Sequence, residues 1–292
     1  NLSPTILISF LPFISSLTLP KKSDLNLARY NFKGSGTSTA AVVFGGAGPA
    51  AANLVGNTEN WDGTSWTEGN DLNQNRYAIN NRGAGTQTAG LCVGGNRRLT
   101  PQGTTSPNLA PQNFFSGTEE YDGSTWTEVG DLNTARGQFP GIGIATAGLV
   151  VGGLVFPSRV GNVESWDGTS WTEVGDLNEG RQETMGLGVY DAALGICGEP
   201  GSGTRVGKVE QWDGSSWTEV ADVNTIRTDA YHHFGSVTAG LIAGGQNPPN
   251  SPNILTNNET WDGSSWTNSP VSLGTARYMH GGAGSTTAAI VF

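Results

Sequence analysis

The chain has 292 residues, of which only 14% are charged, and its formal net charge at pH 7 is −10. A chain with so few basic residues offers no cationic surface to a phosphate backbone, so we expect no nucleic-acid partner. It also has no apolar run long enough to cross a membrane, and we expect no membrane insertion.

The first element of the chain is an apolar segment, residues 1–22. Within it, Thr5–Phe10 is short and rich in apolar and β-branched residues, which favours an additional strand or a tail, and Ile14–Leu19 resembles a degenerate copy of the hairpin described below. A signal peptide is the competing interpretation. However, no basic residues precede the apolar run, and Lys21 and Lys22 lie on its wrong side. Both interpretations remain open at the level of sequence.

From residue 23 onward the chain repeats one pattern. Its first landmark is an aromatic residue, Asp-Gly, two small hydroxyl residues and a Trp, and this hexapeptide occurs five times. Its aromatic residues, which we expect to be structural, are Trp61, Trp66, Tyr121, Trp126, Trp166, Trp171, Trp212, Trp217, Trp261 and Trp266. The second landmark is an arginine that recurs every 45 to 60 residues, at Arg29, Arg76, Arg136, Arg181, Arg227 and Arg277. A period near 50 residues is typical of repeat architectures.

One repeat contains four short segments that predict strands. In the third repeat these are Gly137–Ile144, Ala147–Val151, Val163–Trp166 and Trp171–Val174. Asp-Gly between two aromatic residues predicts a two-residue hairpin turn, because such a turn needs a positive φ at its centre. The nearly continuous apolar second segment predicts a strand that is buried on both faces. The 44 glycines follow the same period, which indicates turns and close strand packing.

Four such strands, with Gly152-Gly153 closing the second and a Trp opening the fourth, resemble the kelch repeat of β-propellers. The resemblance covers residues 23–292 and implies an all-β, six-bladed propeller of four-stranded antiparallel blades. The expected blades span residues 29–71, 76–131, 136–176, 181–222, 227–271 and 277–292. Propellers host many unrelated activities, so this resemblance implies a fold and not a function.

The sixth blade contains only two predicted strands, and residues 1–22 are the candidates for the other two. Alignment backwards from Asp24 places Ile14 and Leu19 where the hairpin aromatics stand in the other copies. These strands either close the ring within one chain or are donated to a neighbouring subunit. The residues expected at this closing or assembly contact are Ile14, Leu17, Leu19, Ile290 and Phe292.

The periodic polar residues indicate structure rather than catalysis. We expect the repeated Asp to form turns, and the repeated Arg to pair across blades or to cap strand-end carbonyls. His232, His233 and His280 fall on first strands and are expected to be exposed polar residues of the channel or its loops rather than metal ligands. Cys92 and Cys197 lie in blades that are not adjacent, which disfavours a disulfide. We therefore expect no catalytic residue, metal or cofactor.

The loop between the second and third strands of blade two is the longest in the chain and is the better place to look for specificity. Phe114 and Phe115 lie in it, and they either anchor a partner or fold back onto their own blade. Arg97 and Arg98 belong to the same candidate partner-binding loop.

The expected function is therefore structural or adhesive, through assembly with other protein subunits or with further copies of the chain. Residues 126–136 have the sequence Trp-Thr-Glu-Val-Gly-Asp-Leu-Asn-Thr-Ala-Arg. This sequence resembles kelch-like repeats of tailed bacteriophages, especially marine ones. This resemblance implies a virion surface, as a tail fibre, head fibre or decoration protein, or an extracellular fibre. The alternative is a lectin that binds cell-surface glycans with its tryptophans and amides. A metal-dependent oxidase-like kelch enzyme ranks third, because neither cysteine is placed for the Tyr–Cys crosslink of that class.

Overall fold

The computed structural model describes residues 24–29, 31–37, 39–48, 54–76, 84–96, 114–201, 203–230, 233–247, 253–278, 282–284, 286 and 289–291. These residues form strands and turns, with no helix among them, as predicted for an all-β chain. The described part accordingly has no helix long and apolar enough to cross a membrane.

The strands form five four-stranded antiparallel sheets and one two-stranded sheet. Sheet one contains β1 Lys33–Gly36, β2 Ala41–Phe44, β3 Thr58–Trp61 and β4 Trp66–Gly69. Sheet two contains β5 Ala84–Thr86, β6 Ala89–Val93, β7 Thr118–Tyr121 and β8 Trp126–Glu128. Sheet three contains β9 Gly141–Ile144, β10 Ala147–Val155, β11 Ser158–Trp166 and β12 Trp171–Val174. Sheet four contains β13 Met185–Val189, β14 Ala192–Ile196, β15 Val209–Trp212 and β16 Trp217–Val220. Sheet five contains β17 His233–Ser236, β18 Ala239–Ala243, β19 Asn258–Trp261 and β20 Trp266–Asn268, and sheet six contains β21 Gly282–Gly284 and β22 Ala289–Val291.

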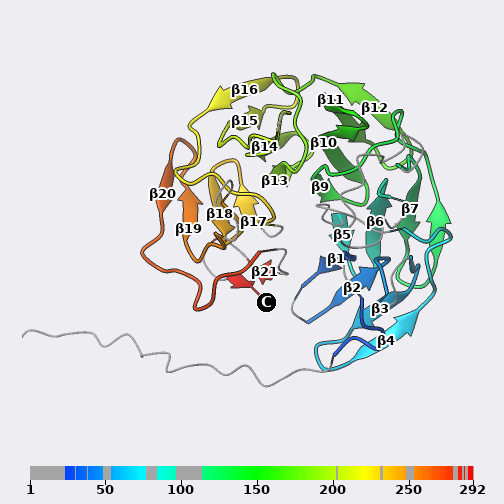
Figure 1. Cartoon of the computed structure of the whole chain (residues 1–292). Helices are drawn as coiled ribbons and strands as arrows, with labels where there is room; N and C mark the ends of the chain where they lie inside the picture. The colour runs from blue at the N-terminus through cyan, green and yellow to red at the C-terminus, as the bar shows by residue number, and fades with distance from the viewer. Residues whose placement is uncertain are drawn as a thin grey trace, which may run out of the picture.

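The sheets stand radially around one axis, with each first strand innermost and each fourth strand at the rim (Figure 1). Neighbouring first strands adjoin one another in sequence order, from β1 and β5 through to β17 and β21. This arrangement confirms the predicted all-β propeller of four-stranded antiparallel blades, and the sheets are called blades one to six below. The described residues contain five complete blades, while blade six has only β21 and β22. Its proposed completing segment, residues 1–22, lies outside the described residues.

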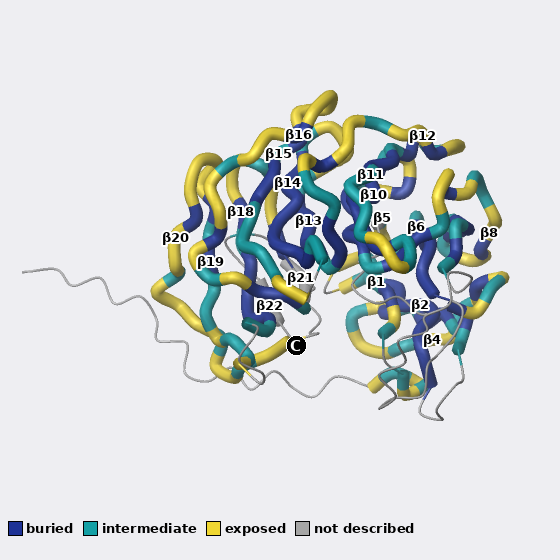
Figure 2. Tube along the Cα trace, turned by 45° about the horizontal axis from the view of Figure 1, so that its top comes forward, coloured by how far each residue is buried: buried dark blue, intermediate teal, exposed yellow. Residues whose placement is uncertain are grey.

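The second and third strands hold most of the buried residues of each blade, whereas the fourth strand and the outer turns are exposed (Figure 2). In blade three, β10 is buried over seven consecutive residues, as expected for a strand that is covered on both faces. Gly152 within it has a φ of 62°, and an added Cβ would stand 2.7 Å from the carbonyl oxygen of Arg181. Glycine is therefore required where the connecting segment from blade three to blade four, residues 175–181, crosses the end of the strand.

The hairpin between the third and fourth strands forms at every Asp-Gly sequence, but its loop has four residues instead of the predicted two. In blade three, Trp166 pairs with Trp171 in the strand register, so residues 167–170 form the loop. The Asp167 carboxylate accepts hydrogen bonds from the backbone N–H groups of Thr169 and Ser170, each at 2.8 Å. The side-chain cap takes over the role of a tight turn, and the structural role predicted for the repeated Asp is confirmed.

The hairpin aromatics form the contacts between blades. Trp212 and Trp217 of blade four pack in one buried cluster with Ile142, Leu149 and Val151 of blade three. The two indole rings also lie against each other, with 5.4 Å between their centroids. The same arrangement joins blades one and two, two and three, and four and five. Each blade is thus held by the apolar surface of the blade before it.

Candidate functional site

A buried ion pair recurs at each junction where one complete blade follows a connecting segment. Its arginine comes from that segment and its glutamate from the third strand of the blade that follows. The pairs are Arg29 with Glu59, Arg76 with Glu119, Arg136 with Glu164, Arg181 with Glu210, and Arg227 with Glu259. All ten side chains are at most 2% exposed.

The cluster around each pair satisfies the buried charges. In blade four, Arg181 donates from Nη2 to Glu210 at 2.6 Å and from Nη1 to the carbonyl oxygens of Cys197 and Lys208. The backbone N–H and side-chain amide of Asn178 donate to the second oxygen of Glu210, at 2.8 and 2.7 Å. Both roles predicted for the repeated arginine, pairing and capping of strand-end carbonyls, are therefore present. Since the cluster repeats in each of the five complete blades, it explains their repeated Arg and Glu as parts of the scaffold.

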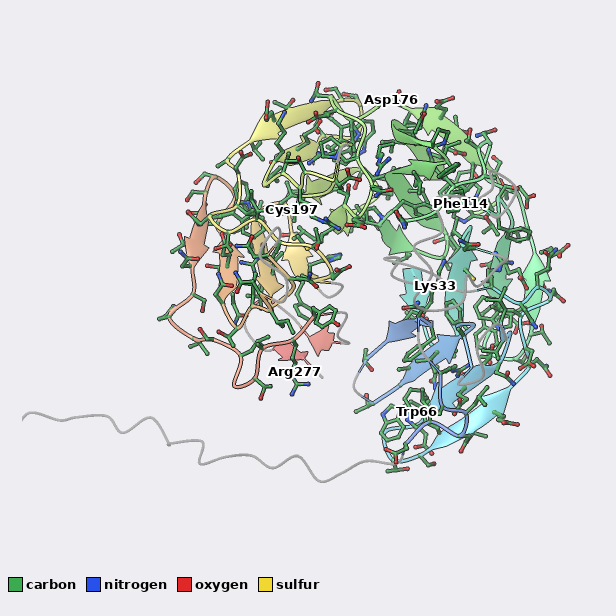
Figure 3. All side chains as sticks on the ribbon, in the orientation of Figure 1. Lys33, Trp66, Phe114, Asp176, Cys197 and Arg277 are labelled. Atoms are coloured by element: carbon green, nitrogen blue, oxygen red, sulfur yellow. The ribbon has the colours of Figure 1, made fainter. Side chains whose placement is uncertain are left out.

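The sixth copy of the connecting segment differs from the other five. It ends in Arg277, whose side chain is exposed where its five counterparts are buried. Ser272 and Gly274 stand where the other copies have Asp and Asn. On the other side of the same junction, Trp66 of blade one is only half-buried, whereas Trp126, Trp171, Trp217 and Trp266 are each 6% exposed. Figure 3 labels Trp66 on blade one and Arg277 on the segment that leads into blade six.

The residues predicted for closing the ring fall mostly outside the described residues. Ile14, Leu17, Leu19 and Phe292 are among them, so the contact expected between these side chains remains a prediction. Ile290 is described only through its backbone, which pairs with Ala283 across the sixth sheet.

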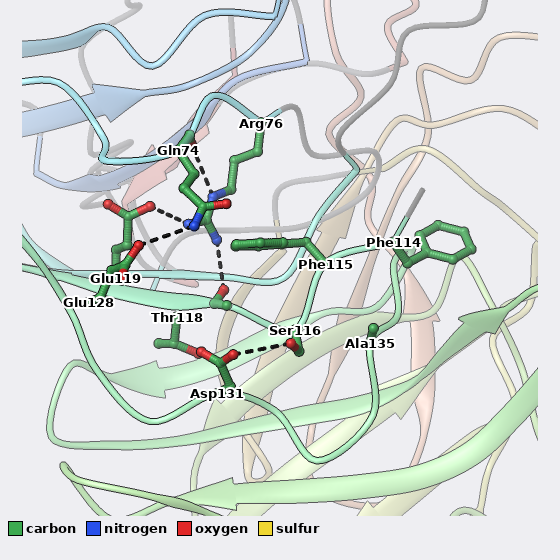
Figure 4. Close-up of a pocket in the computed structure, with 11 residues that line it drawn as sticks. Gln74, Arg76, Phe114, Phe115, Ser116, Thr118, Glu119, Glu128, Asp131 and Ala135 are labelled. Carbon is green, nitrogen blue, oxygen red and sulfur yellow. Dashed lines mark hydrogen bonds and ion pairs between the residues drawn. The ribbon is translucent and has the colours of Figure 1, made fainter. Parts of the chain in front are cut away.

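A cavity of about 290 Å³ lies at the blade-two loop. Phe114, Phe115, Glu128 and Asp131 are among the side chains that line it (Figure 4). Phe115 folds back onto its own blade and is 8% exposed, with its ring centroid 4.3 Å from Cζ of Arg76. Phe114 is half-buried beside Gly137, the first residue after the next connecting segment. The sequence left two roles open for these rings, and Phe115 has one of them, folding back onto its own blade. Arg97 and Arg98 lie outside the described residues.

Comparison with known proteins bears on the fold. No protein-family model matches the chain, and no curated protein matches it in sequence. Among solved structures, the chain is similar to "Structure of YjhT", a kelch-repeat propeller, with a TM-score of 0.65 and 15% sequence identity. The match covers 89% of this chain and 88% of that one. The chain has the fold of a kelch-like β-propeller.

Among the described residues of the first strands, two polar side chains are buried. His233, expected to be an exposed polar residue, is instead only 3% exposed at the start of β17, opposite Ile242. His232 and His280 lie outside the described residues. Lys33 of β1 was not singled out from the sequence. It is 4% exposed, donates to the carbonyl oxygen of Val93 in blade two at 2.6 Å, and burial lowers its pKa to about 8.

The remaining candidates for chemistry are buried or dispersed. Cys92 and Cys197 are both buried and free, and burial raises the pKa of Cys197 to about 11, so its thiol is held protonated. In the described part of the propeller, no group of three or more His, Cys, Asp or Glu side chains is placed to hold a metal ion.

Proposed function

We propose that this propeller is a non-catalytic structural or adhesive subunit that works through protein–protein assembly. Its setting is a virion surface, as a tail fibre, head fibre or decoration protein, or an extracellular fibre. The amino-acid sequence of the repeats supports the viral setting, because it resembles the sequence of kelch-like repeats in tailed bacteriophages. The assembly role is supported by the junction between blade six and blade one.

That junction carries the proposal. Two of its polar and aromatic positions, Arg277 and Trp66, are more exposed than their counterparts at the other junctions. Among the described strands β22 is the outer strand of blade six, and a sheet edge with free hydrogen-bonding groups is a template for an added strand. We propose that residues 1–22 complete this blade, with Ile14–Leu19 as the hairpin between its third and fourth strands, giving a six-bladed ring. They do so within one chain or by donation between neighbouring subunits.

Glycan binding is the weaker alternative because of where the tryptophans lie. Apart from Trp66, the tryptophans of the hairpins are at most 6% exposed and pack between blades. Their ring faces are therefore already used, and stacking on a sugar would fall to other residues.

Removal of residues 1–20 tests the assembly proposal, with a Gly-Ser segment of equal length as the matched control. Closure within one chain predicts a monomer whose size is independent of concentration, and a truncated form that melts at lower temperature. The physical reason is the loss of Ile14, Leu17 and Leu19 from the core, at about 1.5–3 kcal/mol each when fully buried. Donation predicts that the full chain oligomerises, that the truncated chain does not, and that a peptide of residues 1–22 caps its free edge. Unchanged melting and unchanged size after truncation would contradict both forms.

Electron microscopy of native particles tests the virion or fibre setting.

A further inference from the structure

The cavity in blade two lies where the other complete blades have a nitrogen donor. The position is two residues before the ion-paired glutamate. It is occupied by Asn57, Asn162, Lys208 and Asn257 in blades one, three, four and five, and by Gly117 in blade two. Each of the four side chains donates to an oxygen on the fourth strand or on a connecting segment. These contacts are Asn57 to Asp71, Asn162 to Glu173, Lys208 to Glu179 and Glu219, and Asn257 to Thr225.

Blade four shows what the position does when it carries a full positive charge. The ammonium group of Lys208 lies 3.2 Å from Glu179 and 3.8 Å from Glu219. Both glutamates have counterparts in blade two: Glu128 stands at the position of Glu219, and Gln74 at that of Glu179. Blade two thus keeps a carboxylate at one of the two positions that surround the ammonium in blade four and a side-chain amide at the other, where Gln74 donates to Glu128 at 3.1 Å, and it lacks the ammonium itself.

Gly117 is required by the ring that replaces the donor. A Cβ at this position would stand only 2.1 Å from a ring atom of Phe115, so no larger residue fits there while the ring keeps its place. Phe115 in turn lies over Arg76, which is already paired with Glu119. The Phe115 ring therefore takes the space of the Asn or Lys side chain of the other blades. Glu128 and Asp131 line the cavity beyond the ring (Figure 4).

The charge balance of the cavity favours a cation. Arg76 and Glu119 neutralise each other, and among the described residues Glu128 and Asp131 have no cationic partner on the lining. Among the described residues, Glu128 accepts one hydrogen bond from Gln74 at 3.1 Å and Asp131 accepts one from Ser116 at 3.2 Å. Each carboxylate has more acceptor capacity than one such bond uses. An alkylammonium group brings three donors and a positive charge, and it also interacts favourably with an aromatic ring.

We propose that this cavity binds an alkylammonium group supplied by a ligand, as blade four binds its own Lys208. A lysine side chain and an amino sugar both carry this group. The site does not depend on how blade six is completed, so it stands apart from the assembly proposal.

Isothermal titration calorimetry tests the proposal with Nα-acetyl-lysine methylamide, whose ammonium is its only charge, and with its Nε-acetyl derivative. We expect saturable binding of the first in the millimolar range, weakening with added salt, and no binding of the second. Glucosamine and N-acetylglucosamine form a second arm with the same contrast. Binding in either arm supports ammonium recognition, and the arm that binds more tightly identifies the source of the group.

The variant Glu128→Gln removes one charge from an exposed position, so the fold should be retained and binding should weaken at least about tenfold. Glu173→Gln is the matched control at the same position of blade three, where Asn162 already uses the carboxylate; it should leave binding unchanged. Three results would overturn the proposal: no saturable binding of either amine, equal binding of the acetylated compounds, or equal affinity of the wild type and Glu128→Gln.

Discussion

Arg136 and Glu164 form an ion pair that is closed to solvent, with 2.9 Å between Nη2 and Oε1 and side chains 0% and 2% exposed. Glu164 also accepts from the backbone and side-chain amides of Asn133, at 2.7 and 2.9 Å. Burial lowers the pKa of Arg136, and the charge of Glu164 opposes that shift. The pair therefore joins a connecting segment to the next blade at a place where neither charge tolerates the loss of its partner.

Removal of one charge from this pair should be strongly destabilising. Glu164→Gln leaves the buried guanidinium of Arg136 without a counter-charge, which typically costs about 3–5 kcal/mol. Glu219→Gln is the control, since its pair with Lys208 is exposed and such pairs contribute about 0–1 kcal/mol. Urea unfolding followed by tryptophan fluorescence measures both. A Glu164→Gln variant as stable as the control would show that the buried pair does not hold the blades together.

A second prediction concerns the indole N–H of the fourth-strand tryptophans. Trp171 donates to Thr118 Oγ1 of the preceding blade at 3.0 Å. The equivalent residue facing Trp217 is Val163, and the buried Nε1 of Trp217 has no acceptor among the described residues. Thr118→Val should therefore destabilise the propeller by about 1–3 kcal/mol, the cost of an unsatisfied buried donor.

The reverse substitution, Val163→Thr, gives Trp217 the acceptor that Trp171 has. The new hydrogen bond should raise the free energy of unfolding by about 0.5–1.5 kcal/mol. The cost of replacing a buried methyl group by a hydroxyl group is subtracted from this gain. Thermal melting of the two single variants gives the comparison directly. If both substitutions shift the melting temperature in the same direction, the indole–hydroxyl bond is not what distinguishes these junctions.

The turn aspartates predict how stability depends on pH. Hydrogen bonds from the Ser170 backbone and from Thr169 lower the pKa of Asp167 to about 2, and corresponding bonds lower that of Asp213. An unfolded Asp titrates near about 3.9. A lowered folded-state pKa means that the stabilisation is fully present above the unfolded value and is lost as the pH falls toward the folded one.

Asp167→Asn tests this dependence, because it keeps an acceptor oxygen and removes the charge. The wild type should melt above the variant at neutral pH, and the difference should shrink as the pH falls from about 4 to about 2. A difference that stays constant over this range would mean that the charge of Asp167 does not contribute to the turn.

The propeller was predictable because its signals are periodic and local. The Asp-Gly hairpins, the buried second strands and their closing glycines each follow from residue type and spacing. The partners of the arginines were not predictable in detail, because Arg136 and Glu164 meet only when two blades are packed together. The cavity had a sequence signal that was missed: Gly117 stands where the aligned copies have Asn or Lys. Its aromatic wall follows from how Phe115 folds back, which spacing alone does not specify.

The last prediction uses the sixth connecting segment to test the register of the N-terminal strands. If Ile14 and Leu19 occupy the hairpin aromatic positions, the position of the ion-paired glutamate is Pro12. Proline there gives Arg277 no carboxylate and also removes a backbone donor from a central strand. Pro12→Glu should therefore raise the melting temperature for two reasons: it adds a carboxylate that pairs with Arg277, and it restores a backbone N–H donor. Only the first reason involves Arg277.

A double-mutant cycle with Arg277→Ala separates those two reasons, and Pro12→Gln is the control that removes the proline without adding a charge. We expect a coupling of about 0.5–3 kcal/mol between Glu at position 12 and Arg277, as is usual for residues in contact. Pro12→Gln should show no coupling beyond about 0.3–0.5 kcal/mol, the usual limit for independent sites. Adding Gly274→Asn, which restores the amide of the other five clusters, should increase the coupling. A coupling of zero with Pro12→Glu would exclude this register and leave Arg277 to a partner other than residues 1–22.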